Sequence, residues 1–256
     1  MPVIGFVNQK GGVGKTTTAV NLAACLAAAQ RSVLLVDVDP QANTTSAVGV
    51  EKSPPSIYNV LIDGVPILSA TRETFVEHLS LVPSEANLYG AEIELLDFER
   101  REFRLRDALA EVSSSYQYIL LDAPPSLGIL TLNVLAAAES LIIPVQCEYY
   151  ALEGLTLLLQ TIERVRASIN PSLDILGIVM TMYDGRLNIA QQVVSEVRAH
   201  FGDRVFRTPI ARSVRLAEAP SHGKPIIFYD WRSAGAQNYI ALTEEVIHAV
   251  EKTRTR

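Results

Sequence analysis

A glycine-rich segment near the start of the chain holds residue types that bind phosphate. Residues 8–17 read Asn-Gln-Lys-Gly-Gly-Val-Gly-Lys-Thr-Thr, close to the pattern G-x-x-x-x-G-K-[ST]. In such a loop backbone N–H groups surround the phosphates, the lysine reaches the β- and γ-phosphates, and the following hydroxyl ligates Mg²⁺. Lys15 and Thr16 occupy those two positions, whereas Gln9 replaces the first glycine and stands beside an additional lysine, Lys10.

The loop predicts a nucleotide site rather than a tight turn whose glycines serve packing only. A buried strand precedes it and a helical pattern follows it, as a phosphate-binding loop requires. ATP is favoured over GTP because the chain contains no N-K-x-D guanine-reading motif. The residues of the loop expected to bind the nucleotide are Gly11, Gly12, Val13, Gly14, Lys15, Thr16 and Thr17.

Two acidic strand ends are expected to complete the same site. Asp122 ends the apolar run "YILLD", and an Asp at this position next to the loop strand conventionally holds Mg²⁺, often through water. Asp37 and Asp39 end "LLVDVD"; if the strand persists they point to opposite faces, so that one faces the phosphates while the other supports the loop. Either acid could instead cap the following turn. Thr16, Asp39 and Asp122 are therefore the predicted metal-binding residues.

Strands alternate with helical patterns along the whole chain. Strands are expected over 3–7, 32–39, 78–84, 116–125, 139–146, 173–183 and 204–210, and helices over about 15–29 and 103–112. Several strands are continuously apolar, which is typical of a parallel sheet covered by helices on both faces. The pattern predicts one doubly wound α/β domain over residues 1–256, a P-loop NTPase with a single, mostly parallel sheet.

Composition and charge narrow the class of protein. The 256 residues are 48% apolar, no stretch is a membrane span, and no signal peptide is visible, so a cytoplasmic protein is expected. Cys25 and Cys147 lie in apolar surroundings and predict buried thiols rather than a disulfide or metal site. The net charge is -6, yet residues 184–224 hold seven Lys or Arg against four Asp or Glu. This window is compatible with a polyanion docking on one face.

Six motifs together resemble the deviant Walker A ATPases, and specifically the ParA/Soj partition proteins. They are "KGGVGKTT", "DVDPQAN", "LLDAPPS", "PVQCEYYALEGL", "TMYDGR" and "VRLAEAPSHGKPI", which span nearly the whole chain. The resemblance explains Lys10: it matches the signature lysine, which reaches the nucleotide of the partner subunit, so that two monomers sandwich two ATP molecules. A cation supplied in trans stabilises phosphate charge only when both subunits hold ATP. The resemblance thus implies an ATP-bound homodimer in which Lys10, Lys15 and Asp39 are catalytic.

The same resemblance assigns roles to further residues. Asp39 matches the switch I aspartate that positions the attacking water, and Asp122 opens switch II, whose turn Pro124 and Pro125 stiffen. Glu153 matches a residue near the nucleotide that the dimer shares; a helix N-terminal acid that interacts with the helix dipole is the alternative.

In ParA proteins the ATP-bound dimer binds DNA without sequence preference, and slow ATP hydrolysis, stimulated by a ParB/Spo0J-type centromere-binding partner, releases it. The residues that match the DNA-binding positions are Arg186 and Arg215, with Arg212 and Lys224 as additions. Single basic residues are usually solvated, so only their grouping supports this interpretation. The resemblance implies a nucleoid-associated partition protein that requires ATP and Mg²⁺.

Departures from the family and rival functions remain open. Soj-like proteins commonly read "IPRNVRL", whereas this chain has Ala211 and Ser213 in a loop that borders the adenine in relatives. No N-terminal helix-turn-helix extension is expected. A MinD-like membrane switch would need a basic amphipathic tail, whereas Val246, Ile247 and Val250 predict a helix that packs on the sheet before a polar tip. A reductase would need interface cysteines, which the chain lacks.

Overall fold

A seven-stranded sheet forms the centre of the computed structural model, which describes residues 1–149 and 151–254. The strand order is β3-β4-β2-β5-β1-β6-β7, and every neighbouring pair is parallel except β3 and β4. The strands are β1 Val3–Phe6, β2 Val33–Asp37, β3 Arg72–Glu73, β4 Leu79–Val82, β5 Tyr118–Asp122, β6 Ser140–Gln146 and β7 Asp174–Thr181. The predicted mostly parallel α/β architecture is confirmed.

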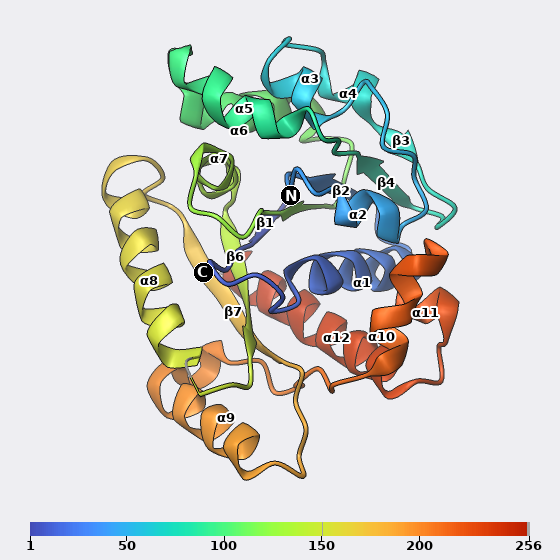
Figure 1. Ribbon diagram of the computed structural model, residues 1–256, viewed down its shortest axis with the longest axis vertical. Helices are drawn as coiled ribbons and strands as arrows, with labels where there is room; N and C mark the ends of the chain where they lie inside the picture. Colours follow the sequence, from blue (N-terminus) through green and yellow to red (C-terminus); the bar gives the residue numbers. More distant parts are fainter. Residues whose placement is uncertain (150, 255–256) are drawn as a thin grey trace.

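Helices cover both faces of this sheet (Figure 1). One face carries α3 Ile57–Leu61, α4 Ile67–Ala70, α5 Leu88–Glu94, α6 Arg104–Leu109, α7 Ile129–Ala137, α8 Ala151–Ser168 and α9 Asn188–Phe201. The other carries α1 Lys15–Ala28, α10 Val214–Glu218, α11 Ile226–Tyr229 and α12 Ala234–Arg254, and α2 Asn43–Ala47 follows β2 near the sheet edge.

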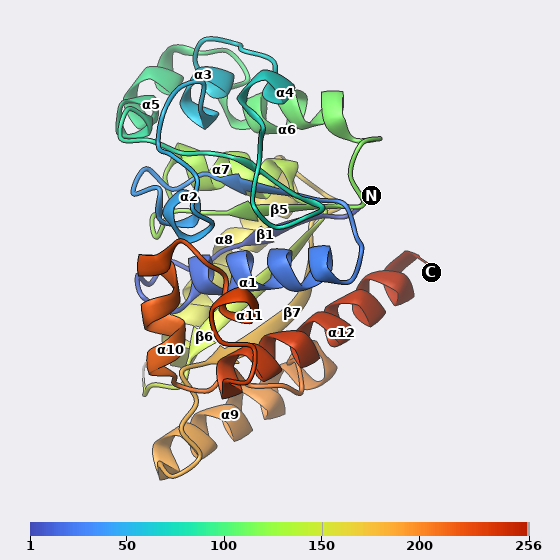
Figure 2. The ribbon, with the colours of Figure 1, turned by 90° about the vertical axis from the view of Figure 1, so that its right-hand side faces the viewer.

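Two hydrophobic clusters follow from the alternation of side chains along buried strands. In β2, Leu34 and Val36 belong to the cluster beneath α3 to α9, whereas Val33 and Leu35 belong to the cluster shared with α1 and α12. All four side chains are fully buried. The sheet is therefore a rigid double-sided support, and it fixes the loops that follow the carboxyl ends of its strands. Figure 2 shows those ends together on one side of the molecule.

Two differences from the predicted elements have local causes. The expected strand over 204–210 does not form: Val205 makes one isolated bridge to Ile178, because residues 202–204 form a 3₁₀ turn and Pro209 has no N–H to donate. The short edge strand β3, antiparallel to β4, was not predicted; two residues are too few to give a periodic signal.

The free cysteines and the end of the chain agree with the expectations. Cys25 and Cys147 are both buried and unpaired with each other. In α12, Val246 and Val250 are buried against the cluster that contains α1, whereas residues 255–256 of the expected polar tip lie outside the described residues. Among the helices of the described part, none has the length and apolar character needed to cross a membrane.

Candidate functional site

The glycine loop connects β1 to α1 at the carboxyl edge of the sheet. Gly12 and Gly14 have φ values of 74° and 90°, the left-handed region in which glycine lacks the penalty of a side chain. Helix α1 begins at Lys15, directly after the left-handed Gly14. The first N–H groups of α1 and the positive end of its dipole therefore face the loop, which creates the anion site that the sequence predicts.

A cavity of about 490 Å³ opens over this loop. Its lining includes Gly11, Gly12, Gly14, Lys15, Thr16, Thr17, Val20, Asn21, Asp39, Gln41, Asn43, Ser46, Ala47, Pro125, Met182, Ala219, Pro220, Lys224 and Pro225. The loop thus meets residues from the segments after β2, β5 and β7. The Val13 side chain is buried and is not among the lining residues, and its carbonyl accepts a hydrogen bond from the Thr181 hydroxyl at 2.8 Å, which ties the loop to the end of β7.

Asp122 carries the arrangement expected of a metal-binding carboxylate. Its Oδ2 accepts hydrogen bonds from the hydroxyls of Thr16 at 2.7 Å and Thr44 at 2.6 Å, while its buried Oδ1 has no partner in the part of the chain described. Buried polar atoms are nearly always paired, so the unpaired Oδ1 of Asp122 is suited to contact a bound ligand. A hydrated Mg²⁺ fits, because it prefers carboxylate, hydroxyl and water oxygens. Burial, the largest cause, raises the pKa of Asp122 to about 6.

The two acids at the carboxyl end of β2, Asp37 within the strand and Asp39 beyond it, have separate tasks. Asp37 is fully buried and accepts from the backbone N–H and the hydroxyl of Thr45, at 2.8 and 2.7 Å, and from the N–H of Asp39. Asp37 thus supports the loop, as one of the alternatives held. Asp39 lies beyond the last residue of β2, lines the cavity and accepts from the N–H of Gln41 at 2.9 Å, so it also caps a turn.

Burial also shifts the pKa values of the other charged groups of the site. Burial, with the nearby Asp122 as second cause, raises the pKa of Asp37 to about 8. Burial is also the largest cause of the raised pKa of Asp39. Burial lowers the pKa of the Lys15 ammonium, although the charge of Asp122 acts in the opposite direction. Burial disfavours the charged Lys15 ammonium, so an anion bound beside it in the cavity would stabilise that charge.

Sequence patterns did not single out three hydroxyl residues that organise these acids. Thr44 and Thr45 bind Asp122 and Asp37, and the Ser84 hydroxyl donates to the Asp39 carbonyl at 2.7 Å. Thr44 and Thr45 follow directly on "DVDPQAN", so the signal for them was adjacency to that motif. Ser84 follows β4, the strand beside β2, which only the sheet order reveals.

Lys10 and Glu153 lie apart from the cavity. The Lys10 ammonium is about half exposed and forms an ion pair with Glu148, which follows β6. Only the carbonyl of Lys10 approaches the site, at 3.4 Å from Lys15 Nζ. Glu153 is exposed in the first turn of α8. Within one protomer, then, neither residue reaches the space above the glycine loop.

The structure brings two of the four candidate DNA-binding residues, Arg186 and Arg212, close together and places Arg215 and Lys224 elsewhere. Arg186 is exposed and makes a two-pronged contact with Asp184, at 2.9 and 2.7 Å, which lowers the pKa of Asp184 to about 2. Arg212 lies nearby, because its N–H donates to the Tyr183 carbonyl. Arg215 pairs with Glu218 at 3.0 Å on α10. Lys224 lines the cavity.

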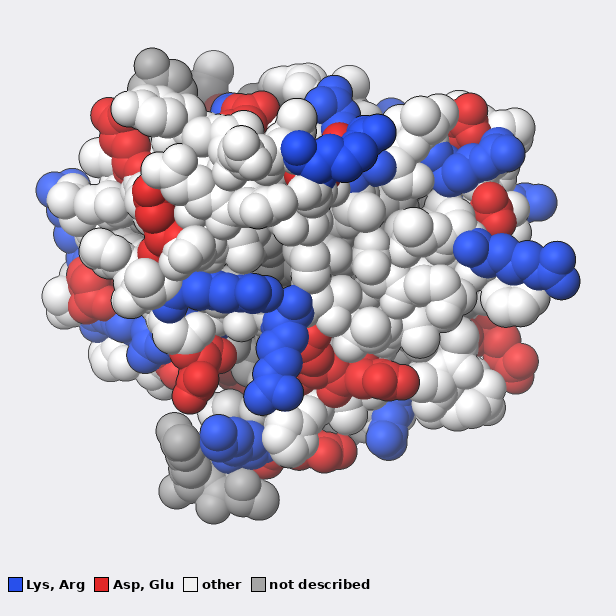
Figure 3. All heavy atoms as spheres, turned by 90° about the horizontal axis from the view of Figure 1, so that it is seen from below, with Lys and Arg blue, Asp and Glu red and all other residues white. Residues whose placement is uncertain are grey.

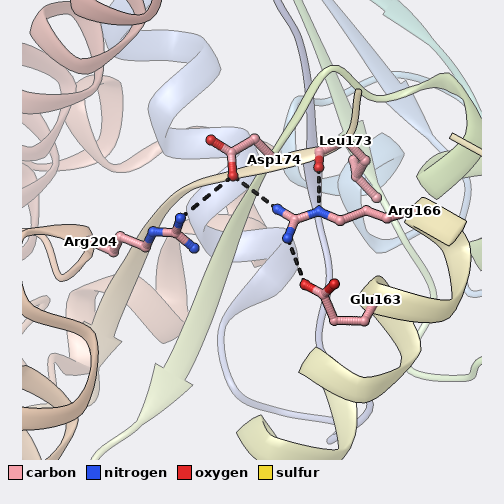
Figure 4. Close-up of polar contacts among 5 residues, drawn as sticks. All are labelled: Glu163, Arg166, Leu173, Asp174 and Arg204. Carbon is pink, nitrogen blue, oxygen red and sulfur yellow. Dashed lines mark hydrogen bonds and ion pairs between the residues drawn. The ribbon is translucent and has the colours of Figure 1, made fainter. Parts of the chain in front are cut away.

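Other arginines of the basic window are engaged in structural contacts. Arg204 lies 3.9 Å from Asp174, the first residue of β7, where Arg166 also binds Asp174, Glu163 and the Leu173 carbonyl (Figure 4). This network sits at the amino end of β7, at the edge of the sheet opposite the cavity. Figure 3 shows Lys and Arg in separate groups among acids and uncharged surface on the side of α9. The basic residues of the window 184–224 therefore do not form one continuous surface patch.

The loop with unusual residues lies beside the cavity rather than in its wall. The Ala211 N–H donates to Asn238 Oδ1, and Ala211 forms a bridge with Tyr183. Ser213 precedes α10. The cavity lining includes neither residue. Ala211 and Ser213 thus belong to a loop that neighbours the cavity.

Comparisons with known proteins agree with this geometry. A family model described as an AAA domain matches residues 1–175. The chain is 52% identical over 246 residues to the sporulation initiation inhibitor protein Soj of Bacillus subtilis, covering 95% of this chain and 97% of that one. It is 53% identical over 247 residues to the chromosome partitioning protein ParA of Myxococcus xanthus, covering 96% of this chain and 87% of that one.

A solved structure matches over the same extent. Cobyrinic acid a,c-diamide synthase from Mycobacterium smegmatis, with bound ADP and magnesium, is 35% identical, has a TM-score of 0.86, and aligns over 98% of this chain and 96% of that one. About half of all residues are shared with Soj and ParA proteins along nearly the whole of this chain. The chain therefore belongs to the ParA/Soj family of chromosome-partitioning ATPases.

Proposed function

We propose that this protein is a Mg²⁺-dependent ATPase that partitions DNA, and that ATP converts it to a sandwich dimer able to bind DNA without sequence preference. The observation that carries the proposal is the cavity over the glycine loop, in which Lys15, Thr16, Asp39 and the free oxygen of Asp122 converge. A similar fold binds ADP and magnesium in the M. smegmatis enzyme. Mg²⁺, when bound, neutralises phosphate charge and orients the phosphates.

The residues of this chain act on ATP in distinct ways. The N–H groups of the loop and the Lys15 ammonium bind the phosphates, and Thr16 with Asp122 holds the metal with its water. Asp39, at the cavity wall, orients the attacking water. Lys10 lies outside its own cavity and is therefore free to serve the site of a second protomer once its pairing with Glu148 is exchanged. Slow hydrolysis, which a ParB-type protein stimulates, returns the monomer.

The DNA surface of the proposed dimer centres on Arg186 and Arg212, with Arg215 at its border. Arg186 and Arg212 adjoin the segment after β7, which Thr181 connects to the glycine loop, so nucleotide and DNA sites share a support. Two weak clusters of phosphate contacts become one stronger site when two protomers associate. Lys224 belongs to the nucleotide cavity in this proposal, not to the DNA surface.

Co-sedimentation with non-specific duplex DNA tests the proposal. Binding is expected with ATP but not with ADP, and it should weaken steeply as salt rises. Arg186→Ala and Arg212→Ala should each lose most of the binding, whereas Arg164→Ala, an exposed arginine of α8, should not. An ATP-dependent dimer that binds no DNA but sediments with anionic vesicles would overturn the proposal in favour of a membrane switch.

A further inference from the structure

The one tryptophan of the sequence, Trp231, lies on the surface between α11 and α12. Its side chain is large and apolar, yet the residue is 59% exposed. Exposed apolar side chains that stand singly are common and need no partner. Trp231 differs from them in two respects: its backbone is held in place by hydrogen bonds, and it adjoins the border of the proposed DNA surface.

Hydrogen bonds on both sides fix the turn that carries Trp231. The Asp230 N–H donates to the Ile226 carbonyl at 2.8 Å, and the N–H and hydroxyl of Ser233 both donate to the Asp230 carbonyl. The Trp231 carbonyl accepts from Gln237 Nε2 at 2.8 Å. The ring is therefore presented from a supported turn. A side chain presented in this way loses little conformational entropy when a ligand binds.

The same turn is continuous with the helix that carries Arg215. Arg215 Nε lies 3.5 Å from Asp230 Oδ2, one residue before Trp231. Helix α10 also packs closely on the start of α12, because a Cβ on Gly235 would lie only 2.7 Å from Leu216 Cγ. Figures 1 and 2 show α10 beside α11 and the start of α12. Trp231 thus extends the surface that has Arg215 at its border.

Arg232 adds a positive charge beside the indole ring. Its guanidinium carbon lies 5.1 Å from the centroid of the Trp231 ring, a cation–π contact. The acids of this surface, Glu218 and Asp230, pair with Arg215. Arg232 itself is exposed and forms no ion pair within residues 1–149 and 151–254. Its charge is therefore available to a phosphate group.

An exposed indole with arginines close by suits single-stranded nucleic acid. Basic side chains follow the phosphates while an aromatic ring stacks on a base, and this stacking tolerates any sequence because every base has a π-face. In a duplex each base is covered by its neighbours, so stacking selects unpaired bases. A membrane surface fits less well, because interfacial binding needs a longer amphipathic helix than the four residues of α11.

We propose that Trp231 stacks on an unpaired DNA base while Arg232 and Arg215 contact the flanking phosphates, so that the protein holds a single-stranded segment as well as duplex DNA. Phosphate then replaces the carboxylates that pair with Arg215 in the nucleotide-free protomer. This inference rests on the proposed function, because Arg215 belongs to the DNA surface proposed there. It adds a base-contacting side chain to a surface that otherwise contacts phosphate.

The intrinsic fluorescence of Trp231 tests the stacking directly, since no other tryptophan contributes to the emission. The intact protein with Mg²⁺ and a non-hydrolysable ATP analogue is titrated with oligothymidylate, or with an abasic oligomer that has the same phosphates but no bases. Oligothymidylate should quench the emission and the abasic oligomer should not. Equal quenching by both oligomers would overturn the proposal. A response to anionic vesicles but not to oligothymidylate would also overturn it, by assigning the ring to a membrane.

Variants of Trp231 are compared by the anisotropy of labelled oligonucleotides, single-stranded and duplex. Trp231→Ala should weaken single-strand binding at least about fivefold and duplex binding less than about twofold, because only unpaired bases reach the ring. Trp231→Phe keeps an aromatic ring and should recover most of the loss. Tyr89→Ala removes another exposed aromatic ring, on α5, and is the control. Unchanged single-strand binding in Trp231→Ala would overturn the proposal.

Arg232 is tested by the salt dependence of the same binding. Arg232→Ala should weaken single-strand binding and reduce its dependence on salt, because one phosphate contact is lost. Arg164→Ala, exposed on α8, is the matched control and should change neither. A salt dependence that Arg232→Ala leaves unaltered would contradict the phosphate contact.

The nucleotide state keeps the two proposals distinguishable. If duplex binding requires ATP but the Trp231 emission does not respond to single strands, the stacking proposal fails and the proposed function stands. If the emission responds to single strands equally with ADP and with ATP, the stacking stands and the ATP-dependent switch fails. If no DNA binds in any nucleotide state, both proposals fail.

Discussion

At the scale of one residue, a substitution of Asp39 should abolish ATP hydrolysis and leave nucleotide binding intact. Its carboxylate lines the cavity and is held by the Gln41 N–H, so its removal leaves the glycine loop, Lys15 and Asp122 in place. We expect Asp39→Ala to bind ATP and form dimers yet to lose hydrolysis by about 100-fold or more, the size of a general-base or water-positioning effect. Phosphate release measures this, with nucleotide affinity as control. Turnover equal to that of the unaltered protein would show that Asp39 only caps its turn.

The pairing of Lys10 with Glu148 predicts a second effect of one residue. Both side chains are about half exposed, so the ion pair contributes at most about 1 kcal/mol. If Lys10 must leave Glu148 to reach the partner's phosphates, Glu148→Gln should tighten ATP-dependent dimerisation by about two- to fivefold. Analytical ultracentrifugation with a non-hydrolysable ATP analogue measures it, and Glu111→Gln is the exposed control. A weaker dimer would mean that Glu148 itself serves the interface.

The glycine loop, as an element, allows a steric test of the proposed sandwich dimer. Gly12→Val would block an opposing loop, yet the φ of 74° at Gly12 means that valine there also strains its own protomer. Gly11 has no such φ, and a Cβ on it would lie 3.9 Å from Pro125, an ordinary contact. We expect Gly11→Val to keep ATP affinity within about threefold and to lose ATP-dependent dimers. Dimers of normal affinity in Gly11→Val would contradict the sandwich.

The elements also show what a sequence can predict about a site. The order strand, glycine loop, helix and the acids at strand ends were readable because each lies in a continuous motif. Ser84 and Glu148 were not, since they meet Asp39 and Lys10 only through the sheet order. The strand expected over 204–210 failed because an apolar pattern does not reveal that a 3₁₀ turn precedes it and that Pro209 interrupts its pairing with β7, which the N–H groups of Phe206 and Ile210 make in isolation.

The basic window shows the same limit at the scale of the whole molecule. Counting charges between residues 184 and 224 gave a positive segment, but folding distributes it over distant places. Arg204 joins the network at the amino end of β7, while Lys224 enters the nucleotide cavity. Charge along a chain predicts a surface only when its residues share one element.

The buried acids couple the stability of the whole molecule to pH. Asp37 and Asp122 face each other in register on β2 and β5, both fully buried, with pKa values raised to about 8 and about 6 from 3.8. Between pH 4 and these values the folded protein holds more protons than the unfolded chain. Protonation therefore stabilises the fold at low pH, and this stabilisation is lost as pH rises through the folded pKa values.

The free energy of unfolding of the nucleotide-free protein should consequently fall between pH 5 and pH 8, by up to about 1.4 kcal/mol per pH unit for each proton retained. Asp37→Asn keeps the shape but not the charge, so it should flatten the slope above pH 6, whereas Asp203→Asn, exposed on the surface, should not. Urea unfolding at a series of pH values measures both. Mg²⁺ and ATP should also flatten the slope, because the metal takes the place of the proton on Asp122. A slope that Asp37→Asn leaves unchanged would show that the buried acids do not control it.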